Sequence, residues 1–402
     1  MSAPAPERTQ VAIVGGGPAG LMLAHLLRLR GVDSVVLESR PRERVETRQR
    51  AGILEHGTVE ALREVGADAR MDELGLPHDG FELRFAGRGV RVDMQELTGE
   101  RVMIWAQTEV TKDLIALRLD HGEPLVFDAE VLAVSDVETD SPSVRYRHGG
   151  SDGEVHVLHA DVVVGADGSY GPSRRAIPEH LVRRFERVYP YSWLGILADV
   201  APSSHELVYA RGRTGFALAS MRSPSVTRAY IQVPNGTDPQ SWADEAIWDE
   251  LSARFALDDG SFTLSRGPIT DKSVTPMRSM VTEPMRHGRL FLAGDAAHIV
   301  PPTGAKGLNL AVADVRVLAE ALGEWFATKD ETLMDAYSDT ALRRVWRASH
   351  FSWTMTTMLH VDPDGDPFDE QLALSHLHHI ESSESARRAL AENYRGLALG
   401  AL

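Results

Sequence analysis

Ser220 and Arg222 stand two residues apart in FALASMRS, a stretch running from Phe216 to Ser223. Its alternation is typical of a half-buried strand and predicts that both side chains point to one face. The chain carries a formal charge of -16, so binding an anion would require a positive site that is built locally. Arg222, in an apolar setting, is therefore a candidate for such a site.

A second group of residues has the spacing of a nucleotide site. Gly15, Gly17 and Gly20 form the pattern GxGxxG, and Glu38 closes the strand that follows. Glycines at these positions allow a tight turn and let a pyrophosphate approach backbone amides at a helix N-terminus. Glu38 can accept hydrogen bonds from a ribose 2'-hydroxyl but would repel a 2'-phosphate, which favours FAD or NAD over NADP. GxGxxG alone is weak evidence, but its strand–turn–helix setting favours nucleotide binding over a purely structural turn.

The elements that would position these groups are spread along the chain. Residues 10–38 have the pattern of strand, glycine turn, helix and strand, and two later apolar runs end in Asp167-Gly168 and Gly294-Asp295. Residues 181–270 instead carry short alternating stretches separated by Gly, Pro and Ser, which predicts a mostly antiparallel sheet. From residue 330 onward the spacing of apolar residues is helical.

These patterns predict an α/β fold of α+β character, in which separated segments build the nucleotide-binding part. We expect a Rossmann-like FAD-binding domain from residues 1–75, 100–180 and 270–345. An inserted, mostly antiparallel substrate-binding β-sheet domain would come from residues 76–99 and 181–269. Residues 346–402 would form a helical C-terminal region.

The composition is that of an ordinary globular protein, with 402 residues of which 43% are hydrophobic and 25% charged. The negative charge, without a basic run interleaved with aromatics, argues against nucleic acid or an anionic membrane as a partner. The chain has no cysteine, which excludes disulfides and thiolate catalysis. With no signal-peptide pattern and no run of about 20 apolar residues, we expect a cytoplasmic protein.

Two stretches resemble metal sites only superficially. HLHHI, which begins at His376, has the spacing of a helix surface and lacks a further ligand nearby. DPDGDP resembles the start of a calcium loop, but Pro367 and Ala373 stand where that loop needs glycine and glutamate. We therefore expect no metal.

Three motifs occur in a fixed order: Gly15 to Gly20, Asp167-Gly168 and Gly294-Asp295. In this order the sequence resembles the flavoprotein aromatic hydroxylases, which are single-component FAD monooxygenases. Stretches such as RQRAGILEHG, ERVYPYSWLGILAD and GDAAHIVPPTGAKGLNLA extend the resemblance over most of the chain. It implies hydroxylation of 4-hydroxybenzoate to 3,4-dihydroxybenzoate by O2 through a flavin C4a-hydroperoxide, with NADPH or NADH as reductant. It also implies a homodimer with the C-terminal helices at its interface.

The resemblance implies a site for the substrate carboxylate. Ser220 and Arg222 match its donors, because a guanidinium fork and a hydroxyl suit a carboxylate, and Tyr230 matches a further contact. If all three share one face, the loop between their strands must contain an odd number of residues, such as Ser223 to Thr227. A slip of one residue would turn Tyr230 to the opposite face.

The resemblance also implies how the phenol end is handled. Tyr209 matches the tyrosine that binds the substrate hydroxyl, and Tyr394 matches the second member of a proton relay. His78 matches the residue that passes the proton to solvent, and Pro302 matches a proline whose carbonyl faces the hydroxyl. Two phenols of similar pKa can pass a proton with little penalty.

Further matches concern the cofactors. Flavin contacts are implied for Arg50, Gln107, Asp167, Asp295 and Asn309, and Arg228 matches an arginine that helps hold the flavin and the protein conformation. Basic contacts to NAD(P)H are implied for Arg44, Arg48 and Arg278.

The reductant site departs from the family pattern in three places. Ser39 and Arg44 replace an arginine and a tyrosine that strictly NADPH-using members carry, and Tyr170 stands where a histidine is expected. The choice between NADPH and NADH therefore stays open.

Two alternative functions also stay open. The first is the same chemistry on a related acid, namely 3-hydroxybenzoate, 4-aminobenzoate or 3,4-dihydroxybenzoate. The second is a non-catalytic FAD-binding or nucleotide-sensing protein, which NAD(P)H consumption that depends on the aromatic acid would exclude.

Overall fold

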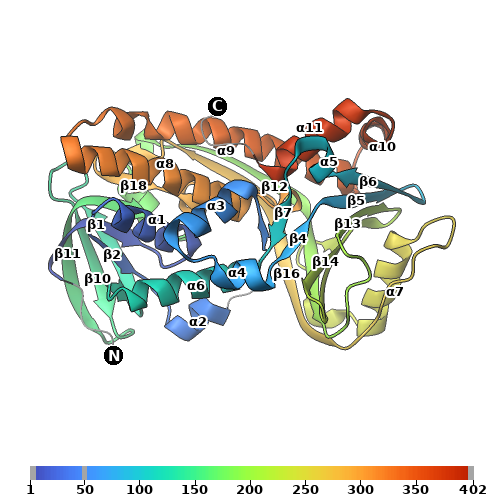
Figure 1. Cartoon of the computed structure of the whole chain (residues 1–402), viewed down its shortest axis with the longest axis horizontal. Coiled ribbons are helices and arrows are strands. Elements are labelled where there is room, and N and C mark those ends of the chain that lie inside the picture. The colour runs from blue at the N-terminus through green and yellow to red at the C-terminus, as the bar shows by residue number, and fades with distance from the viewer. Residues whose placement is uncertain (1–5, 48–51, 397–402) are drawn as a thin grey trace.

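The computed structural model describes residues 6–47 and 52–396, which form two eight-stranded sheets and one three-stranded sheet (Figure 1). The first sheet contains β1 (Arg8–Val14), β2 (Ser34–Leu37), β8 (Leu125–Val126), β9 (Ala129–Ser135), β10 (Ser143–His148), β11 (Glu154–Gly165), β17 (Arg286–His287) and β18 (Leu290–Leu292). Strands β18, β11, β1, β2 and β8 are neighbours in that order and run parallel. Their central residues are apolar without alternation because both faces of this part of the sheet are buried.

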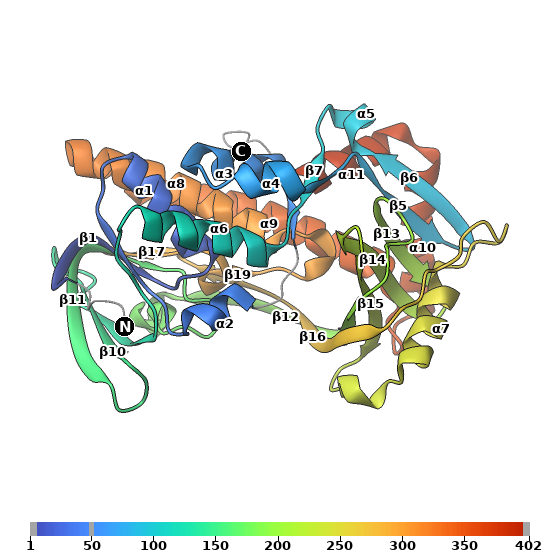
Figure 2. The same ribbon diagram turned by 60° about the horizontal axis from the view of Figure 1, so that its bottom comes forward.

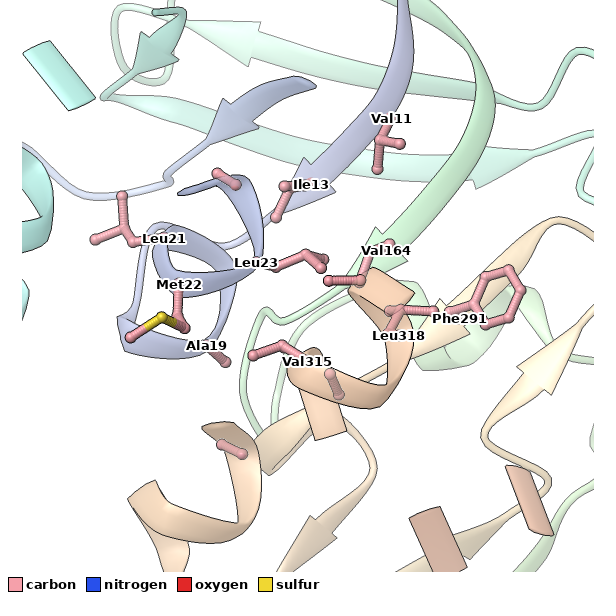
Figure 3. Packing of buried hydrophobic residues seen from close by; sticks show 14 of the residues in the cluster. Val11, Ile13, Ala19, Leu21, Met22, Leu23, Val164, Phe291, Val315 and Leu318 are labelled. Atoms are coloured by element: carbon pink, nitrogen blue, oxygen red, sulfur yellow. The ribbon is translucent and has the colours of Figure 1, made fainter. Parts of the chain in front are cut away.

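Helix α1 (Pro18–Leu29) follows β1 through the glycine turn and packs on this sheet. Gly17 is its N-cap residue and Pro18 begins the helix, a position where proline's missing N–H is not needed. Figure 3 shows Leu23 of α1 among Ile13 of β1, Val164 of β11 and Val315 of a later helix. The strand–helix–strand unit predicted from residues 10–38 is confirmed.

Helices cover the sheets and connect them. Those not yet named are α2 (Arg42–Thr47), α3 (His56–Val65), α4 (Ala69–Leu74), α5 (Met94–Thr98), α6 (Gln107–Asp120), α7 (Asp244–Phe255), α8 (Gly307–Thr328), α9 (Thr332–Leu359), α10 (Pro367–Ser382) and α11 (Glu384–Arg395). Helix α9 is the longest of the described chain and lies along the top of Figure 1, reaching from the first sheet toward α10 and α11. The helical C-terminal part expected from residue 330 onward is confirmed as far as residue 395.

The second sheet contains β5 (Gly80–Phe85), β6 (Arg88–Asp93), β12 (Arg183–Ala198), β13 (Leu207–Gly212), β14 (Gly215–Ser223), β15 (Val226–Pro234), β16 (Ile269–Glu283) and β19 (His298–Ile299). Its strand order is β19-β16-β12-β15-β14-β13-β5-β6, and all neighbours are antiparallel except the pair β13 and β5. The mostly antiparallel sheet predicted for residues 181–270 is confirmed. A small third sheet contains β3 (Ile53–Leu54), β4 (Leu76–His78) and β7 (Val102–Ile104).

The two faces of the second sheet carry different side chains. Small aliphatic residues such as Ala217 and Ala229 face α7, in one hydrophobic cluster with Trp248 and Leu251 of that helix. The alternate residues, Tyr209 among them, belong to a second cluster with the end of α9 and with α11. This alternation follows from the two-residue period of a strand, and it leaves the larger side chains on the α9 side.

Long strands connect the two ends of the molecule. Strands β12 and β16 pair with each other from residue 183 to residue 198, and Figure 2 shows them passing between the first sheet and the α7 end. The division into an FAD-binding part and a substrate-binding part stays a prediction. Across the described ranges we find no helix with the length and apolar character needed to cross a membrane.

Buried histidines predict a loss of stability in acid. Burial lowers the pKa of His25 from 6.5 to about 4, and burial does the same for His78. A lowered folded-state pKa means that the unfolded chain binds the extra proton first, so stability falls as pH drops from 6.5 toward 4. Each residue should contribute about 3 kcal/mol to this loss.

Urea unfolding between pH 7 and pH 4 tests this expectation. His25→Gln should reduce the decline in unfolding free energy, whereas the same change at exposed His180 should leave it as in the unsubstituted protein. An identical pH dependence for His25→Gln and the unsubstituted protein would contradict the assignment.

Candidate active site

A cavity of about 510 Å³, measured with its open mouth, lies on the α9-side face of the second sheet. It brings together six residues that the sequence singles out: Tyr209, Ser220, Arg222, Arg228, Tyr230 and Pro302. The remaining lining residues are Gly52, Ile53, Ile104, Trp193, Leu207, Leu218, Met221 and Ala305. An apolar cavity with a few convergent polar groups is the usual form of a small-molecule site.

Strand register places Tyr209 and Tyr230 on the same side of the sheet. Leu218 of β14 pairs with Tyr209 of β13 and with Tyr230 of β15, so the three residues form one row. Gly195 of β12 continues the row, and a Cβ there would lie 2.9 Å from the Tyr230 ring. Directly paired residues share a face, so the register itself directs both tyrosines into the cavity.

The expected odd loop from Ser223 to Thr227 is wrong as stated. The turn between β14 and β15 consists of Pro224 and Ser225, an even number. A register shift between Met221 and Ser223 leaves Arg222 as an extra, bulged residue. Beyond the bulge Leu218 pairs with Tyr230, so Ser220 and Tyr230 point to the same face of the sheet. The consecutive residues Met221 and Arg222 both line the cavity at this bulge, whereas strict alternation predicted only Arg222 on that face.

Two guanidinium groups share the cavity. Burial in the first place, and the nearby charge of Arg228 in the second, lower the pKa of Arg222 to about 10. Arg228 donates from Nε to the Tyr230 hydroxyl, and its buried Nη1 has no hydrogen-bond partner among the described residues. The sequence implied that Arg228 helps to hold the flavin, and here its side chain lines the same cavity as Arg222. This end of the cavity is therefore built to receive an anion.

Tyr209, which lines another part of the cavity, pairs with a second buried tyrosine behind it. The hydroxyls of Tyr209 and Tyr394 are 2.6 Å apart, although the residues are 185 positions apart in sequence. Phe81 stacks on the Tyr394 ring at 4.3 Å and meets Tyr209 edge-on at 5.8 Å. Burial raises the pKa of both phenols, so each holds its proton at neutral pH.

A buried ion pair binds the backbone carbonyl of Tyr394. Lys306 Nζ lies 2.5 Å from Glu55 Oε1 and donates to the carbonyl of Tyr394 at 2.9 Å. Burial lowers the pKa of Lys306, and the Glu55 carboxylate opposes this. The pair connects the loop after β3, the start of α8 and the end of α11, three segments that are remote in sequence.

His78 lies buried at the end of β4 with Nε2 at 3.2 Å from Met221 Sδ. Burial lowers its pKa to about 4, so the imidazole is neutral at physiological pH. Its Nδ1 has no hydrogen-bond partner among the described residues, and no hydrogen bond in that part of the chain connects it to the tyrosine pair. Its part in carrying a proton to solvent stays a prediction.

The turn at Pro302 forms another wall of the cavity. The Pro302 carbonyl accepts a hydrogen bond from Ala305 N at 2.9 Å, which leaves one lone pair for another donor. Ala305 has a φ of 53°, in the left-handed region that alanine rarely adopts. Thr303 holds the turn to α9 through a 3.0 Å hydrogen bond from Thr356 Oγ1 to Thr303 Oγ1. Backbone strain that is retained by its surroundings is typical of functional sites.

The three glycine-containing motifs meet at one edge of the first sheet. Gly15 follows β1, Asp167 follows β11 and Gly294 follows β18, and these three strands are parallel neighbours. Glu38 follows β2, the next strand, and accepts hydrogen bonds from Gly16 N and from Arg40 N, both at 2.8 Å. Ligands of parallel α/β sheets bind at the carboxyl ends of the strands, which is this edge.

Comparison with known proteins agrees with this arrangement. Residues 8–352 match the family model described as FAD binding domain. The chain is 45% identical, over 97% of its length and 96% of the relative's, to the p-hydroxybenzoate hydroxylase of Acinetobacter baylyi. The chain belongs to the flavoprotein aromatic hydroxylase family.

Other members are more distant. The chain is 31% identical to the 3-(3-hydroxy-phenyl)propionate/3-hydroxycinnamic acid hydroxylase 2 of Burkholderia vietnamiensis, covering 78% of this chain and 56% of that protein. The crystal structure of p-nitrophenol 4-monooxygenase PnpA from Pseudomonas putida superposes with a TM-score of 0.79 at 20% identity, covering 98% of this chain and 100% of that one. At this identity the superposition demonstrates a common fold.

FAD is the cofactor of the flavoprotein aromatic hydroxylases, and the residues at the edge of the first sheet fit it. Gly15 has a φ of 112°, and a Cβ on Gly20 would lie 2.0 Å from the Gly15 carbonyl oxygen, so both close the turn tightly. A Cβ on Gly17 would meet nothing within 4 Å, so the space above the N-terminus of α1 can take a pyrophosphate. Asp167 offers a buried Oδ1 without a partner in the described chain, and Asp295 is exposed at the same edge.

Gln107 and Asn309, two implied flavin contacts, differ in how far their side chains are already bound to protein. Gln107 begins α6 and is half-buried, which leaves its side chain able to reach a ligand. Asn309 is buried, and both ends of its amide already bind protein: Oδ1 accepts from Glu55 N and Thr58 Oγ1, and Nδ2 donates to Ile53 O and Ala305 O. Its side chain therefore joins the start of α8 to the segment at residues 53–58.

The residues implied for NAD(P)H are only partly described. Arg48 and the flavin-contact candidate Arg50 lie outside the described residues, and Arg44 is exposed on α2. The Arg278 guanidinium lies 5.4 Å from the centre of the Tyr170 ring, which is 81% exposed.

Further arginines lie near Arg278. Burial lowers the pKa of Arg174, and the charges of Arg184, Arg278 and Arg175 lower it further. Four guanidinium groups therefore gather on a protein whose net charge is -16.

Sequence reasoning missed several lining residues, chiefly Trp193, Met221 and Ala305. Trp193 belongs to the stretch SWLGILADV, whose alternation predicted a strand but not its neighbours in the sheet. The register to β15 decides which of its residues face Tyr230, and register depends on tertiary contacts.

The glycine turn predicts two different effects of adding one methyl group. Gly17→Ala should fold normally, because its φ of -77° suits alanine, but should weaken FAD binding at least about tenfold by crowding the pyrophosphate. Gly20→Ala should destabilise the fold itself by roughly 1–3 kcal/mol through the contact with Gly15. Flavin fluorescence quenching and urea unfolding of the apoprotein measure these quantities, and equal FAD affinity in Gly17→Ala would contradict the placement.

Proposed function

We propose that this flavoprotein aromatic hydroxylase acts on 4-hydroxybenzoate and produces 3,4-dihydroxybenzoate, with NAD(P)H as reductant and O2 as the source of the added oxygen. The observation that carries the proposal is the single cavity shared by Ser220, Arg222, Tyr230 and Tyr209. It combines donors for a carboxylate with a phenol that can meet a hydroxyl. The name of the relative at 45% identity supports the same substrate.

The spacing of these groups suits a para-substituted ring. Tyr209 and Tyr230 lie two strands apart, which separates their backbones by about 10 Å. A benzene ring with a carboxylate at one end and a hydroxyl at the other, each with its hydrogen-bond partner, spans a comparable length. Leu218 lies between the two tyrosines and offers an apolar surface to the ring.

The carboxylate end would be held by charge and by geometry. Arg222 can form two parallel hydrogen bonds to a carboxylate, and the anion would offset the repulsion between Arg222 and Arg228. Within the described residues the Ser220 hydroxyl donates a long 3.3 Å hydrogen bond to the carbonyl of Met221, a weak contact that a ligand oxygen could replace. Tyr230 accepts from Arg228 and therefore has its own O–H available as a donor.

The phenol end would move a proton without forming a stable tyrosinate. Because burial raises the pKa of Tyr209 and of Tyr394, an isolated ionised tyrosine is disfavoured there. A concerted transfer, in which Tyr209 receives the substrate proton and donates its own to Tyr394 while Tyr394 releases its own hydroxyl proton toward solvent, avoids that state, and the 2.6 Å contact allows its first step. The Pro302 carbonyl can accept from the substrate hydroxyl and orient it.

Bound FAD would supply the oxygen chemistry, while the chain positions the ring and excludes water. Gly15, Gly17, Gly20 and Glu38 would hold the adenine nucleotide half of the cofactor. Asp167, Asp295 and Gln107 would contact the remainder.

The reductant would bind at the basic cluster around Arg278. Guanidinium groups of Arg174, Arg175, Arg184 and Arg278 can receive phosphates, and exposed Tyr170 can stack on a planar base.

Part of the same proposal is that the enzyme acts in the cytoplasm, where NAD(P)H is regenerated, and as a homodimer. The C-terminal helices support the homodimer, because Trp346 and Trp353 are both about two-fifths exposed on α9.

The test uses purified holoenzyme with NADPH and, separately, NADH. Reductant oxidation should depend on 4-hydroxybenzoate, and chromatography should find 3,4-dihydroxybenzoate in equal amount. Stronger stimulation and hydroxylation with 3-hydroxybenzoate, 4-aminobenzoate or 3,4-dihydroxybenzoate would replace the substrate. Reductant oxidation that no aromatic acid stimulates would overturn the proposal.

Arg222→Lys tests the carboxylate site directly. A lysine keeps the charge but cannot form the two-pronged contact, so the dissociation constant for 4-hydroxybenzoate should rise by roughly 10- to 100-fold. Arg213→Lys, on the exposed turn between β13 and β14, is the matched control and should bind as the unsubstituted enzyme does. Flavin absorbance changes on titration with the acid measure both constants, and unchanged affinity in Arg222→Lys would remove this residue from the site.

A further inference from the structure

His360 directly follows α9 and is buried against the second sheet, with only 3% of its surface exposed. Its Nε2 accepts a 2.6 Å hydrogen bond from the indole Nε1 of Trp193, and its Nδ1 lies 2.8 Å from the carbonyl oxygen of Thr356. An indole N–H can only donate and a carbonyl can only accept, so the proton of this imidazole is on Nδ1. Burial lowers the pKa of His360 to about 3, which keeps the imidazole neutral near physiological pH.

Aromatic neighbours hold the imidazole ring in place. Phe216 stacks on it at 4.3 Å with an interplanar angle of 18°, and Tyr191 stacks at 4.6 Å with an angle of 8°. Both nitrogens are already bound, so rotation of the ring would break two hydrogen bonds and two stacking contacts. His360 therefore presents its acceptor to Trp193 in a single orientation.

The backbone around His360 is fixed to the same sheet face that carries the cavity. Arg211 of β13 donates from Nη1 to the carbonyl of Met358, at 3.3 Å, and to that of His360. Gln232 of β15 binds both backbone polar groups of Val361, donating to its carbonyl at 2.5 Å and accepting from its amide at 3.1 Å. Since β12 supplies Trp193 and β14 supplies Phe216, four neighbouring strands hold the end of α9.

Trp193 lies at the border between this docked segment and the cavity. It lines the cavity, and its ring centre is 4.9 Å from that of Tyr230. His360 is the hydrogen-bond acceptor that directs the indole N–H away from the cavity. If that acceptor were lost, the buried N–H would be left unsatisfied or would turn toward the carboxylate donors.

The same turn of α9 also supports the wall of the cavity at Pro302. Thr356, whose carbonyl binds His360, donates from its hydroxyl to Thr303 in the turn that begins at Pro302. A Cβ on Gly304 would lie 2.7 Å from Ser352 Oγ, so this turn packs directly on α9. The distance between the Trp193 wall and the Pro302 wall thus depends on one helical turn.

We propose that His360 is a positioning residue for substrate selection, which holds Trp193 as a flat wall against the ring of the aromatic acid and keeps the cavity one ring wide. The proposal rests on the function proposed above. Its action is indirect, because His360 does not line the cavity and reaches the ligand only through Trp193.

The test is a double-substitution cycle with His360→Phe and Trp193→Phe. His360→Phe keeps an aromatic ring in the stack but removes the acceptor, so the dissociation constant for 4-hydroxybenzoate should rise about tenfold. The ratio of kcat/KM for 4-hydroxybenzoate over 3-hydroxybenzoate should fall, a readout that does not depend on the amount of folded enzyme. In the Trp193→Phe background, which has no N–H to hold, His360→Phe should add little further change.

Controls separate positioning from folding. His350→Phe changes an exposed histidine of the same helix and should alter neither affinity nor selectivity. His360→Gln, whose amide oxygen can accept from Trp193, should recover part of the selectivity. If His360→Phe does not fold, Trp193→Phe and His360→Gln still decide, because Trp193→Phe must then lower the selectivity and His360→Gln must lie between it and the unsubstituted enzyme.

Three outcomes would overturn the inference. The first is additive effects in the cycle, the second is an unchanged selectivity ratio in His360→Phe, and the third is an unchanged ratio in Trp193→Phe. A failure of the proposed function would look different. In that case the unsubstituted holoenzyme would itself show no oxidation of NAD(P)H that depends on 4-hydroxybenzoate.

Discussion

The cavity and the sheet around it depend on the burial of one positive charge, that of Arg222. Removing the guanidinium of Arg222 from water is costly, and the neighbouring charge of Arg228 adds to the cost, as the lowered pKa of Arg222 reflects. An anion bound in the cavity would offset both the cost of desolvation and the repulsion between the two arginines. Because the overall charge is -16, the protein as a whole does not attract an anion, so the sheet has to create the positive site locally.

The second sheet meets this requirement by giving its two faces separate tasks. One face, with Ala217 and Ala229, packs on α7 and contributes only apolar burial. The other face carries the cavity and, beside it, the docked end of α9 around His360. The bulge at Arg222 reconciles a two-residue turn with the pairing that both tyrosines need. A strand without that irregularity would have to move either the turn or the register.

The first sheet, which carries the residues that fit FAD, forms its site from strand ends and not from a sheet face. Parallel strands β1, β11 and β18 bring three remote motifs to one edge, and backbone geometry there leaves space for a nucleotide. The ion pair of Glu55 and Lys306 then joins that side to α11 and thereby to Tyr394. Breaking this pair would leave an uncompensated buried charge, so it holds the relay tyrosine as well as the fold.

The sequence by itself determined the features that depend on neighbours in the chain. The glycine turn at Gly15, the helix after it, the alternating strands and the long C-terminal helices follow from local backbone preferences and apolar periodicity. The resemblance to a family added Tyr209 and Tyr394 as partners, which no local pattern pairs.

Tertiary structure alone decided that these two hydroxyls lie 2.6 Å apart, that Arg222 occupies a bulge and that Trp193 faces the cavity against His360. Each of these depends on strand register or on packing between segments more than a hundred residues apart. Such contacts arise from the shape of the whole core, and a one-residue slip in a single strand would remove them.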